Sequence, residues 1–180
     1  PAKCRDREPR LIRTATGGDA WLIEGETAKE VPSDLYGGKG RENWTPFGQT
    51  YEGTAGTGSP QQRMEEQDLD GIDAEVLYPC QVGGPWFWRN IPDDDAYLSI
   101  VRGYNDWLME EYCSASPDRL IGLGIIPMSD AAGAVAEMEH CARLGYKGVL
   151  LSAFPNNKGY PTPEDDLFWA AAQDMAMPAT

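Results

Sequence analysis

The feature that most constrains the fold is the alternation of short apolar segments with longer amphipathic segments from Ser59 onward. Strands are predicted over residues 74–79 (AEVLYP), 120–127 (LIGLGIIP) and 147–152 (KGVLLS), and residues 177–180 (MPAT) are predicted to begin a fourth. Helices are predicted over residues 60–70, 93–113, 129–145 and 163–175. Continuous apolar strands that alternate with helices predict an α/β fold with a parallel sheet covered on both faces.

Capping residues set the expected helix boundaries. Ser59 and Pro60 form an N-cap followed by a first-turn proline, and Gly71 supplies the stop. In the same way, Ser129 is the predicted N-cap of the helix over residues 129–145, and Gly145 closes that helix.

The first part of the chain has a different character. Two apolar arms, residues 11–14 and 20–23, flank Gly17 and Gly18, which predicts a β-hairpin. The following Gly-, Pro- and Thr-rich residues predict a covering loop. We therefore divide the chain into a hairpin and covering loop over residues 1–58 and an α/β domain over residues 59–180.

Composition excludes several classes of partner. The chain has 29 acidic and 15 basic residues and a net charge of -14, so it would repel nucleic acid and anionic membranes. It contains neither an apolar run long enough for a membrane span nor a signal peptide, which favours a soluble cytoplasmic protein. The four cysteines are widely spaced, so reduced thiols are expected rather than a zinc knuckle or a disulfide framework.

Ligands in parallel α/β folds bind beyond the carboxyl ends of the strands, which draws attention to the residues that follow each predicted strand. Tyr78, Pro79 and Cys80 follow the first strand, and the next ten residues carry an aromatic run beside one cation. The candidate substrate-binding residues are Tyr78, Pro79, Trp86, Trp88, Arg89 and Phe154, with Asn156 and Asn157 as further lining residues.

Two interpretations of the aromatic run remain open. It either lines a pocket for a planar or anionic ligand, or it packs on the protein's own core or on a second subunit. In the first case Trp88→Ala and Arg89→Ala would weaken substrate use without lowering the melting temperature. In the second case the melting temperature would fall and the kinetics would be unchanged.

Familiar catalytic motifs are missing from the sequence. It has no G-x-S-x-G, no G-x-G-x-x-G after a strand and no phosphate-binding loop. The single histidine, His140, lies in a predicted helix, so an ordinary helix histidine is favoured over a catalytic pair with Cys80. The acidic runs 93–95 and 164–166 each open a helix, where carboxylates favour the dipole, so metal ligation is disfavoured there.

Several longer phrases together resemble a known family. They are MEEQDLDGIDAEVLYP, YNDWLMEEYCSASPDRLIGLGIIPMSD, AVAEMEHCARLGYKGVLLSAFP and DDLFWAAAQDMAMPA, in this order and spacing. They resemble the amidohydrolase-related metal-dependent hydrolases and decarboxylases, which include aminocarboxymuconate-semialdehyde decarboxylase and the γ-resorcylate decarboxylases. The similarity is strong over residues 61–180.

The resemblance implies a (β/α)8 TIM-type barrel with zinc or manganese at the strand ends. It also implies a small-molecule substrate and a homodimer for the full-length parent. The family's metal ligands lie on its first, fifth and eighth strands and on one later histidine, and none of those positions is present here. The chain is therefore interpreted as a fragment holding strands two to four and the start of strand five, with no catalytic or metal-ligating residue of its own.

The function is accordingly predicted for the full-length parent protein of which this chain is interpreted as a fragment. It is a metal-dependent carboxy-lyase or hydrolase acting on a small carboxylated substrate, and the fragment alone is expected to be inactive and to bind no metal. The alternative is a non-catalytic binding or assembly module that lacks the metal site.

Overall fold

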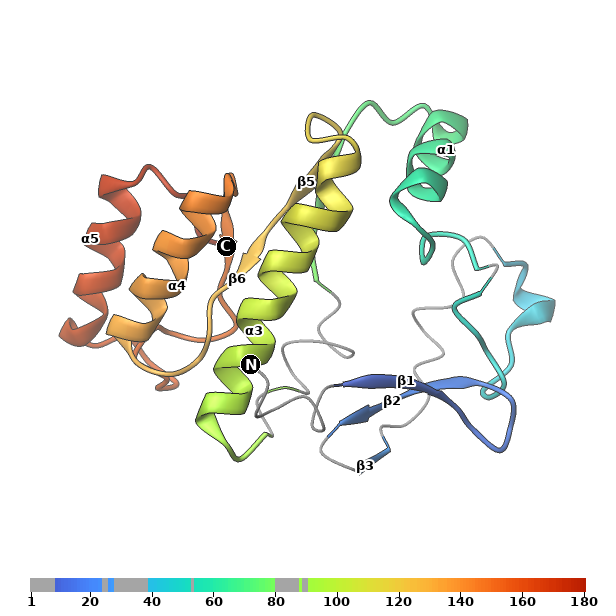
Figure 1. Cartoon of the computed structure of the whole chain (residues 1–180), viewed down its shortest axis with the longest axis horizontal. Coiled ribbons are helices and arrows are strands. Elements are labelled where there is room, and N and C mark those ends of the chain that lie inside the picture. The colour runs from blue at the N-terminus through green and yellow to red at the C-terminus, as the bar shows by residue number, and fades with distance from the viewer. Residues whose placement is uncertain (1–8, 24–25, 28–38, 53, 80–87, 89–90) are drawn as a thin grey trace. The chain divides into compact units, whose positions relative to one another are not determined.

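The computed structural model describes residues 9–23, 26–27, 39–52, 54–79, 88 and 91–180. The chain forms two compact units, Pro1–Asp73 and Ala74–Thr180, which are treated separately below. Figure 1 shows the elements of both units. The sequence-based division after residue 58 assigned the helix at residues 60–70 to the second part, whereas here that helix belongs to the first unit.

The first unit contains an antiparallel sheet. Strand β1 (Arg10–Arg13) pairs with β2 (Asp19–Ile23), and β2 pairs with the short β3 (Glu26–Thr27). The turn between β1 and β2 needs the left-handed backbone of Gly17, with φ at 85°. The predicted hairpin is therefore confirmed, one residue earlier in each arm than expected.

A buried carboxylate holds the covering loop to this hairpin. Asp19, which is 6% exposed, accepts a hydrogen bond from the backbone N–H of Tyr51 at 2.7 Å. Arg13 forms an ion pair with the same carboxylate at 3.3 Å. After the short helical turn η3 (Arg41–Asn43), the unit ends with helix α1 (Pro60–Asp70). The Ser59 side chain caps α1 and Gly71 ends it, as predicted.

The second unit is built on parallel strands. Strand β4 (Glu75–Leu77) pairs with β5 (Leu120–Gly122), and β6 (Gly124–Ile125) pairs with β7 (Val149–Leu150). Strands β5 and β6 form one extended segment, because Leu123 N donates to Leu77 O while Gly124 N donates to Gly148 O on the other side. Residues 120–125 therefore lie between β4 and β7.

Beyond β7 the chain's last residues add another parallel segment. Val149 N donates to Pro178 O at 2.9 Å, and Thr180 N donates back to Val149 O at 3.0 Å. The parallel bridge between Val149 and Ala179 confirms the prediction that a fourth strand begins in residues 177–180. The α/β class and the order of the strands are thus as expected.

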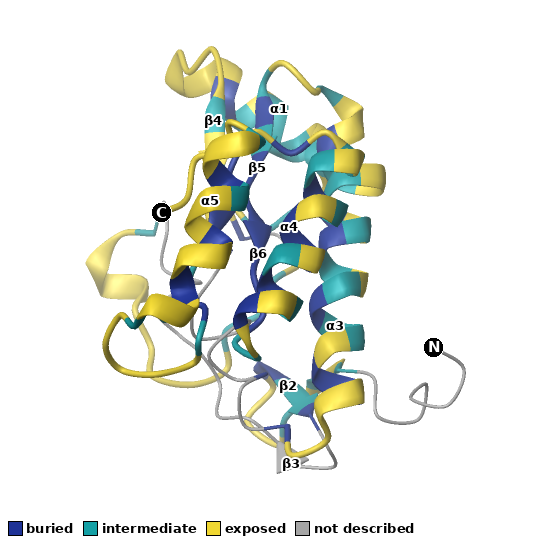
Figure 2. Ribbon diagram, turned by 90° about the vertical axis from the view of Figure 1, so that its left-hand side faces the viewer, coloured by how far each residue is buried: buried dark blue, intermediate teal, exposed yellow. Residues whose placement is uncertain are grey.

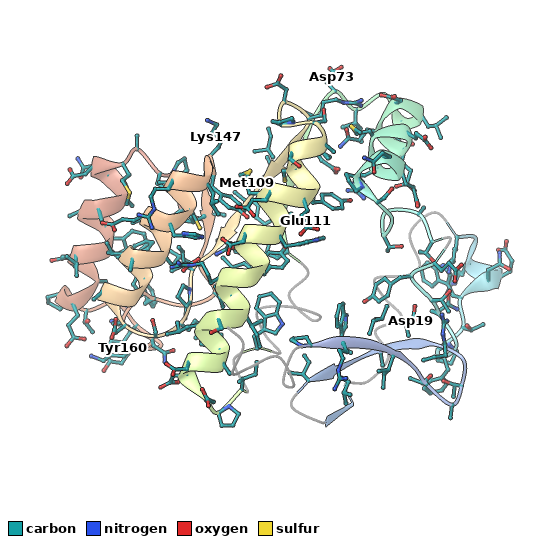
Figure 3. All side chains as sticks on the ribbon, in the orientation of Figure 1. Asp19, Asp73, Met109, Glu111, Lys147 and Tyr160 are labelled. Carbon is teal, nitrogen blue, oxygen red and sulfur yellow. The ribbon has the colours of Figure 1, made fainter. Side chains whose placement is uncertain are left out.

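Helices cover one face of these strands. They are α3 (Asp94–Trp107), α4 (Ala131–Leu144) and α5 (Asp166–Asp174), which lie side by side in Figure 1. The turns η4 (Leu108–Tyr112) and η5 (Cys113–Ala115) continue α3, and η6 (Pro163–Asp165) precedes α5. Figure 2 shows the buried sides of the three helices turned toward β5 and β6. Among the described residues, every helix is too short or too polar to span a bilayer.

Two glycines allow the helices to approach the sheet closely. A Cβ at Gly122 would lie 3.1 Å from Cys113 Sγ, and one at Gly124 would lie 2.5 Å from Cys141 Sγ. The opposite face carries Val76 and Tyr78, which are 48% and 60% exposed. β4 is thus exposed on this face, whereas Val149 and Leu150, consecutive residues of β7 that point to opposite faces, are both buried.

The helix ends agree with the sequence in part. Asp93 caps α3 by accepting a hydrogen bond from Ala96 N at 2.9 Å, as expected for the acidic run. The N-cap of α4 is Asp130, which accepts from Gly133 N at 2.7 Å, and not the predicted Ser129. Both residue types favour this position, so the sequence alone could not choose between neighbours.

Gly103 offers a test of the helix packing. Nothing lies within 4 Å of a Cβ built there, so Gly103→Ala should raise the free energy of unfolding by about 0.5 to 1 kcal/mol through the lower entropy of the unfolded chain. In contrast, Gly124→Ala should lower it by about 1 to 3 kcal/mol because the methyl group meets Cys141. Urea unfolding followed by circular dichroism measures both, and a stabilising Gly124→Ala would contradict the close helix–sheet contact.

Candidate functional site

The carboxyl ends of the parallel strands form one edge of the second unit. Tyr78 and Pro79 follow β4, Pro127 follows β6 by one residue, and Ser152 to Phe154 follow β7. Tyr78 is exposed, Pro79 and Pro127 are buried, and Phe154 is half-buried. The structure thus brings Tyr78, Pro79 and Phe154 to the same edge of the parallel strands. Their role toward a substrate stays a prediction.

The ladder between β4 and the central segment stops after the bond from Leu123 to Leu77, since Pro79 has no N–H to donate. Beyond this point a side chain takes the place of a strand. Ile125 N donates to Asn105 Oδ1 at 2.8 Å, and Asn105 Nδ2 donates to Ile125 O at 2.9 Å. An amide side chain can replace a strand in this way because it presents one acceptor and one donor side by side, as a peptide group does.

Asn105 is itself held by a buried polar network between α3 and α4. Its Nδ2 also donates to Glu137 Oε1 at 2.8 Å, and Arg102 Nε donates to Glu137 Oε2 at 2.7 Å. This hydrogen bond raises the pKa of Arg102 above its ordinary value, so the guanidinium stays charged. Tyr146 donates its hydroxyl to Asn105 O at 2.7 Å, and burial raises the pKa of that hydroxyl.

The single histidine belongs to the same helix pair. His140 Nε2 lies 2.6 Å from Asp106 Oδ1, so the side chain links α4 to α3. Its position on the helix-covered face agrees with the prediction of an ordinary helix histidine. Cys80, the proposed partner of a rejected catalytic pair, lies outside the described residues.

The buried thiols are free and unreactive in character. Cys113 and Cys141 are both buried and form no disulfide in this structure. Burial, followed by the charge of Glu137, raises the pKa of Cys141 to about 12. A thiol with such a pKa remains neutral near pH 7 and is a poor nucleophile or metal ligand. Cys4 lies outside the described residues.

Trp88 packs on the protein itself. Its side chain is 6% exposed, and its ring centroid lies 5.3 Å from that of Tyr104 on α3. The contact continues to Trp107 at 5.9 Å and from there to Tyr112 at 5.6 Å. At Trp88 this favours packing on the chain's own core over a pocket wall. Trp86 and Arg89, the other two candidates of the aromatic run, lie outside the described residues.

The loop after β7 is ordered by two polar side chains. Asp165, which is 1% exposed, accepts from Asn156 N at 2.7 Å and from Thr162 N at 2.8 Å. Asn156 Nδ2 also donates to the Asp165 carboxylate at 2.7 Å. The acidic run 164–166 therefore opens a helix, as predicted, and in addition fixes the loop. Asn157 is exposed at the loop's surface with φ at 58°.

The described residues do not fit a metal centre. In the part of the chain that the structure describes, no group of three or more His, Cys, Asp or Glu side chains could hold a metal ion. His140 and Asp106 converge in a pair only, on the face covered by helices. That the isolated chain binds no metal stays a prediction.

Sequence reasoning missed Asn105, Asp165 and Tyr97 as organising residues. Tyr97 accepts a hydrogen bond from Met128 N at 2.9 Å and so holds the loop after β6. One signal was present for Asn105, since it lies four residues after Val101 on the buried stripe of its helix, where a polar residue is unusual. Nothing in the local sequence marked Asp165 as more than a helix-opening carboxylate.

Comparison with known proteins shows what the chain is similar to. The sequence profile of the amidohydrolase family matches residues 93–180. The gamma-resorcylate decarboxylase of Rhizobium radiobacter is 28% identical to the chain over 123 residues, which are 64% of this chain and 36% of that protein. The chain thus spans about a third of the length of the curated relatives it matches.

Solved structures extend the comparison. The 2,6-dihydroxybenzoate decarboxylase from Rhizobium matches with a TM-score of 0.53 and 28% identity, over 65% of this chain and 37% of that chain. The 5-carboxyvanillate decarboxylase of Novosphingobium aromaticivorans, solved with manganese and a nitrobenzoic acid, has a TM-score of 0.56 and 25% identity, over 66% and 32% of the chains. Both relatives are decarboxylases of carboxylated aromatic compounds.

A third structure covers nearly all of this chain. The amidohydrolase from Mycobacterium avium subsp. paratuberculosis matches 99% of this chain and 52% of its own, with a TM-score of 0.70 and 16% identity. This likeness supports the α/β fold alone, and it includes the N-terminal unit.

The Asn105 contacts predict a large effect on stability. Asn105→Leu should lower the free energy of unfolding by about 3 to 5 kcal/mol, because it leaves buried polar groups of Ile125 and Glu137 without their partner. Gln173→Leu, at an exposed position of α5, should change it by about 0.5 kcal/mol or less. Urea unfolding gives both values, and similar values for the two variants would contradict the role of Asn105.

Trp88 gives a second test. Its packing on Tyr104 leads us to expect that Trp88→Ala lowers the free energy of unfolding by about 3 to 5 kcal/mol. A pocket role for Trp88 predicted the opposite, namely that this substitution would leave the melting temperature unchanged. Trp169, which is 41% exposed, is the matched control, and Trp169→Ala should cost clearly less. Equal melting temperatures for Trp88→Ala and for the unsubstituted chain would favour the pocket role again.

Proposed function

We propose that this chain forms strands two to four and the start of strand five of a (β/α)8 TIM-type barrel. The order of β4, the β5–β6 segment, β7 and residues 178–180, all parallel, supports this assignment. Helices α3, α4 and α5 follow the successive strands on one face, as the outer helices of such a barrel do. The exposed face with Val76 and Tyr78 is then the side turned toward the barrel interior.

The complete enzyme that contains this segment is proposed to be a metal-dependent decarboxylase of a small carboxylated aromatic compound. The observation that carries the proposal is the 28% identity over 123 residues to a gamma-resorcylate decarboxylase, across the strands and helices just described. Relatives of the same fold are decarboxylases solved with manganese. Hydrolysis of a related substrate is the second reaction to be tested, since both occur among the proteins that the sequence resembles.

In decarboxylation the bond between the ring carbon and the carboxylate carbon breaks, carbon dioxide leaves, and the ring carbon takes up a proton. A divalent metal can supply charge stabilisation in such a site. The described residues offer no convergent ligand set, so we assign no step through a metal to this chain. Its proposed contribution is to bind and orient the ring through Tyr78 and Phe154 at the strand ends.

The proposal gives different roles to the remaining candidate residues, Trp86, Trp88, Arg89 and Pro79. Arg89 keeps its proposed role as a cation for a substrate carboxylate, and Trp86 keeps its role as an aromatic wall. Trp88 and Pro79 are buried, so their proposed contribution is to support the edge from within the packed core. Zinc and manganese both remain candidate metals, and a homodimer remains the proposed assembly.

The proposed reaction can be tested on the polypeptide encoded by the genomic region that contains this segment. We expect it to release carbon dioxide from 2,6-dihydroxybenzoate and to lose at least about 90% of its rate when a chelator removes the metal, as metal-dependent catalysis requires. Manganese or zinc should restore the rate. The 180-residue chain alone should bind less than stoichiometric metal by elemental analysis.

Three outcomes would contradict the proposal. Activity that is insensitive to chelators would contradict the metal requirement. Cleavage of an ester or lactone without release of carbon dioxide would show that the reaction is hydrolysis and not decarboxylation. A flanking coding sequence without a metal-ligand set would favour the non-catalytic binding or assembly module.

A further inference from the structure

The loop that follows β7 is closed by an unusual set of hydrogen bonds. Asn156 Oδ1 accepts from Lys158 N at 2.7 Å, and Asn156 Nδ2 donates to Thr162 Oγ1 at 2.8 Å and to Asp165 Oδ2 at 2.7 Å. The backbone N–H of Asn156 donates to Asp165 Oδ1 at 2.7 Å. The side chain of Asn156 is thus used as both donor and acceptor, and the loop folds back on itself around it.

Asp165 is more than the cap of a helix. The contribution of the Asp165 side chain to the capping box is a single bond, which it accepts from Thr162 N at 2.8 Å. The two further bonds from Asn156, nine residues earlier in the chain, add nothing to the helix start. They join the start of α5 to the loop after β7 through one buried carboxylate. A buried carboxylate that accepts three hydrogen bonds fixes its donors in place because each unmade bond would be costly.

The residues just before Asn156 lie at the edge where the candidate site is. Pro155 is almost fully buried and fixes one end of the short segment 152–155. Leu151 N donates to Thr180 O at 2.8 Å and fixes the other end to the last parallel segment. Phe154 lies between these two anchors and is half-buried, and its backbone O accepts from Asn157 N at 2.8 Å.

We propose that Asn156 and Asp165 are positioning residues that hold Phe154 in one conformation at the carboxyl edge, so that its ring forms a fixed wall for an aromatic ligand. This rests on the proposed function for the nature of the ligand. Neither residue touches the ligand, and both act through the loop. A preformed wall binds a planar ring more tightly than a mobile loop, because no side chain has to be ordered on binding.

Amide hydrogen exchange on the full 180-residue chain tests the holding of the loop. Asn156→Ala leaves the Thr162–Asp165 cap intact, so exchange at Lys158 should become at least about tenfold faster while α5 keeps its protection. Asp165→Asn should accelerate exchange at both Asn156 and Thr162. The matched control is Asp166→Asn, which removes the same charge from the neighbouring exposed position and should change these rates by less than about twofold.

The amide of Ile125, bonded to Asn105 in the helix-covered sheet, serves as the internal reference for global folding. If a variant also speeds amide exchange at Ile125, the increase in the exchange rate at Lys158 is compared with the increase at Ile125. Only a larger increase at Lys158 supports the proposal. Unchanged exchange at Lys158 in Asn156→Ala would overturn it, because the loop would then be held without these bonds.

Ligand binding separates this proposal from the proposed function. The binding test uses the metal-loaded polypeptide encoded by the genomic region that contains this segment. With 2,6-dihydroxybenzoate as the probe, calorimetry should show a Kd raised at least about fivefold in Asn156→Ala and Asp165→Asn, and unchanged in Asp166→Asn. A faster-exchanging loop with unchanged affinity would overturn the positioning role. No binding by the unsubstituted polypeptide, together with selective loop exchange in the variants, would count against the proposed ligand class and leave the holding of the loop supported.

Discussion

The bond pair between Asn105 and the backbone of Ile125 is the constraint on which the second unit depends. It takes the place of a strand beside Ile125, connects α3 to the central strand, and links Glu137, Arg102 and Tyr146 in one polar network. A fully satisfied buried network specifies one arrangement, so it fixes the register between helices and strands.

The loops at the strand ends are held by polar side chains. Tyr97 of α3 holds the loop after β6, and Asp165 of η6 bonds to Asn156 within the loop after β7. Tyr97 and Asp165 thus come from helical elements, whereas the residues they position lie at the carboxyl edge. Rigid support from behind a site is what a binding edge requires, since a wall that moves loses affinity. This arrangement suits the proposed role of the chain as part of an amidohydrolase-superfamily enzyme.

Much of the fold could be predicted because it depends on local patterns. The strand at residues 120–125, the helix capped by Ser59 and the hairpin around Gly17 each have their signal within about ten residues of sequence. The α4 cap at Asp130 and the exposed face of β4 could not be predicted in this way. The first depends on a choice between two adjacent good caps, and the second depends on what packs against each side of the strands.

The sequence by itself determined the strand–helix order, the absence of familiar nucleophile motifs and the resemblance to the amidohydrolases, because these depend on residue type and spacing. Only the tertiary structure decided that Trp88 packs on Tyr104, that His140 pairs with Asp106, and that Asp165 reaches back to Asn156. Each of these contacts joins residues whose side chains are oriented by separate elements. Their meeting is therefore a property of the packed chain and not of any local stretch of it.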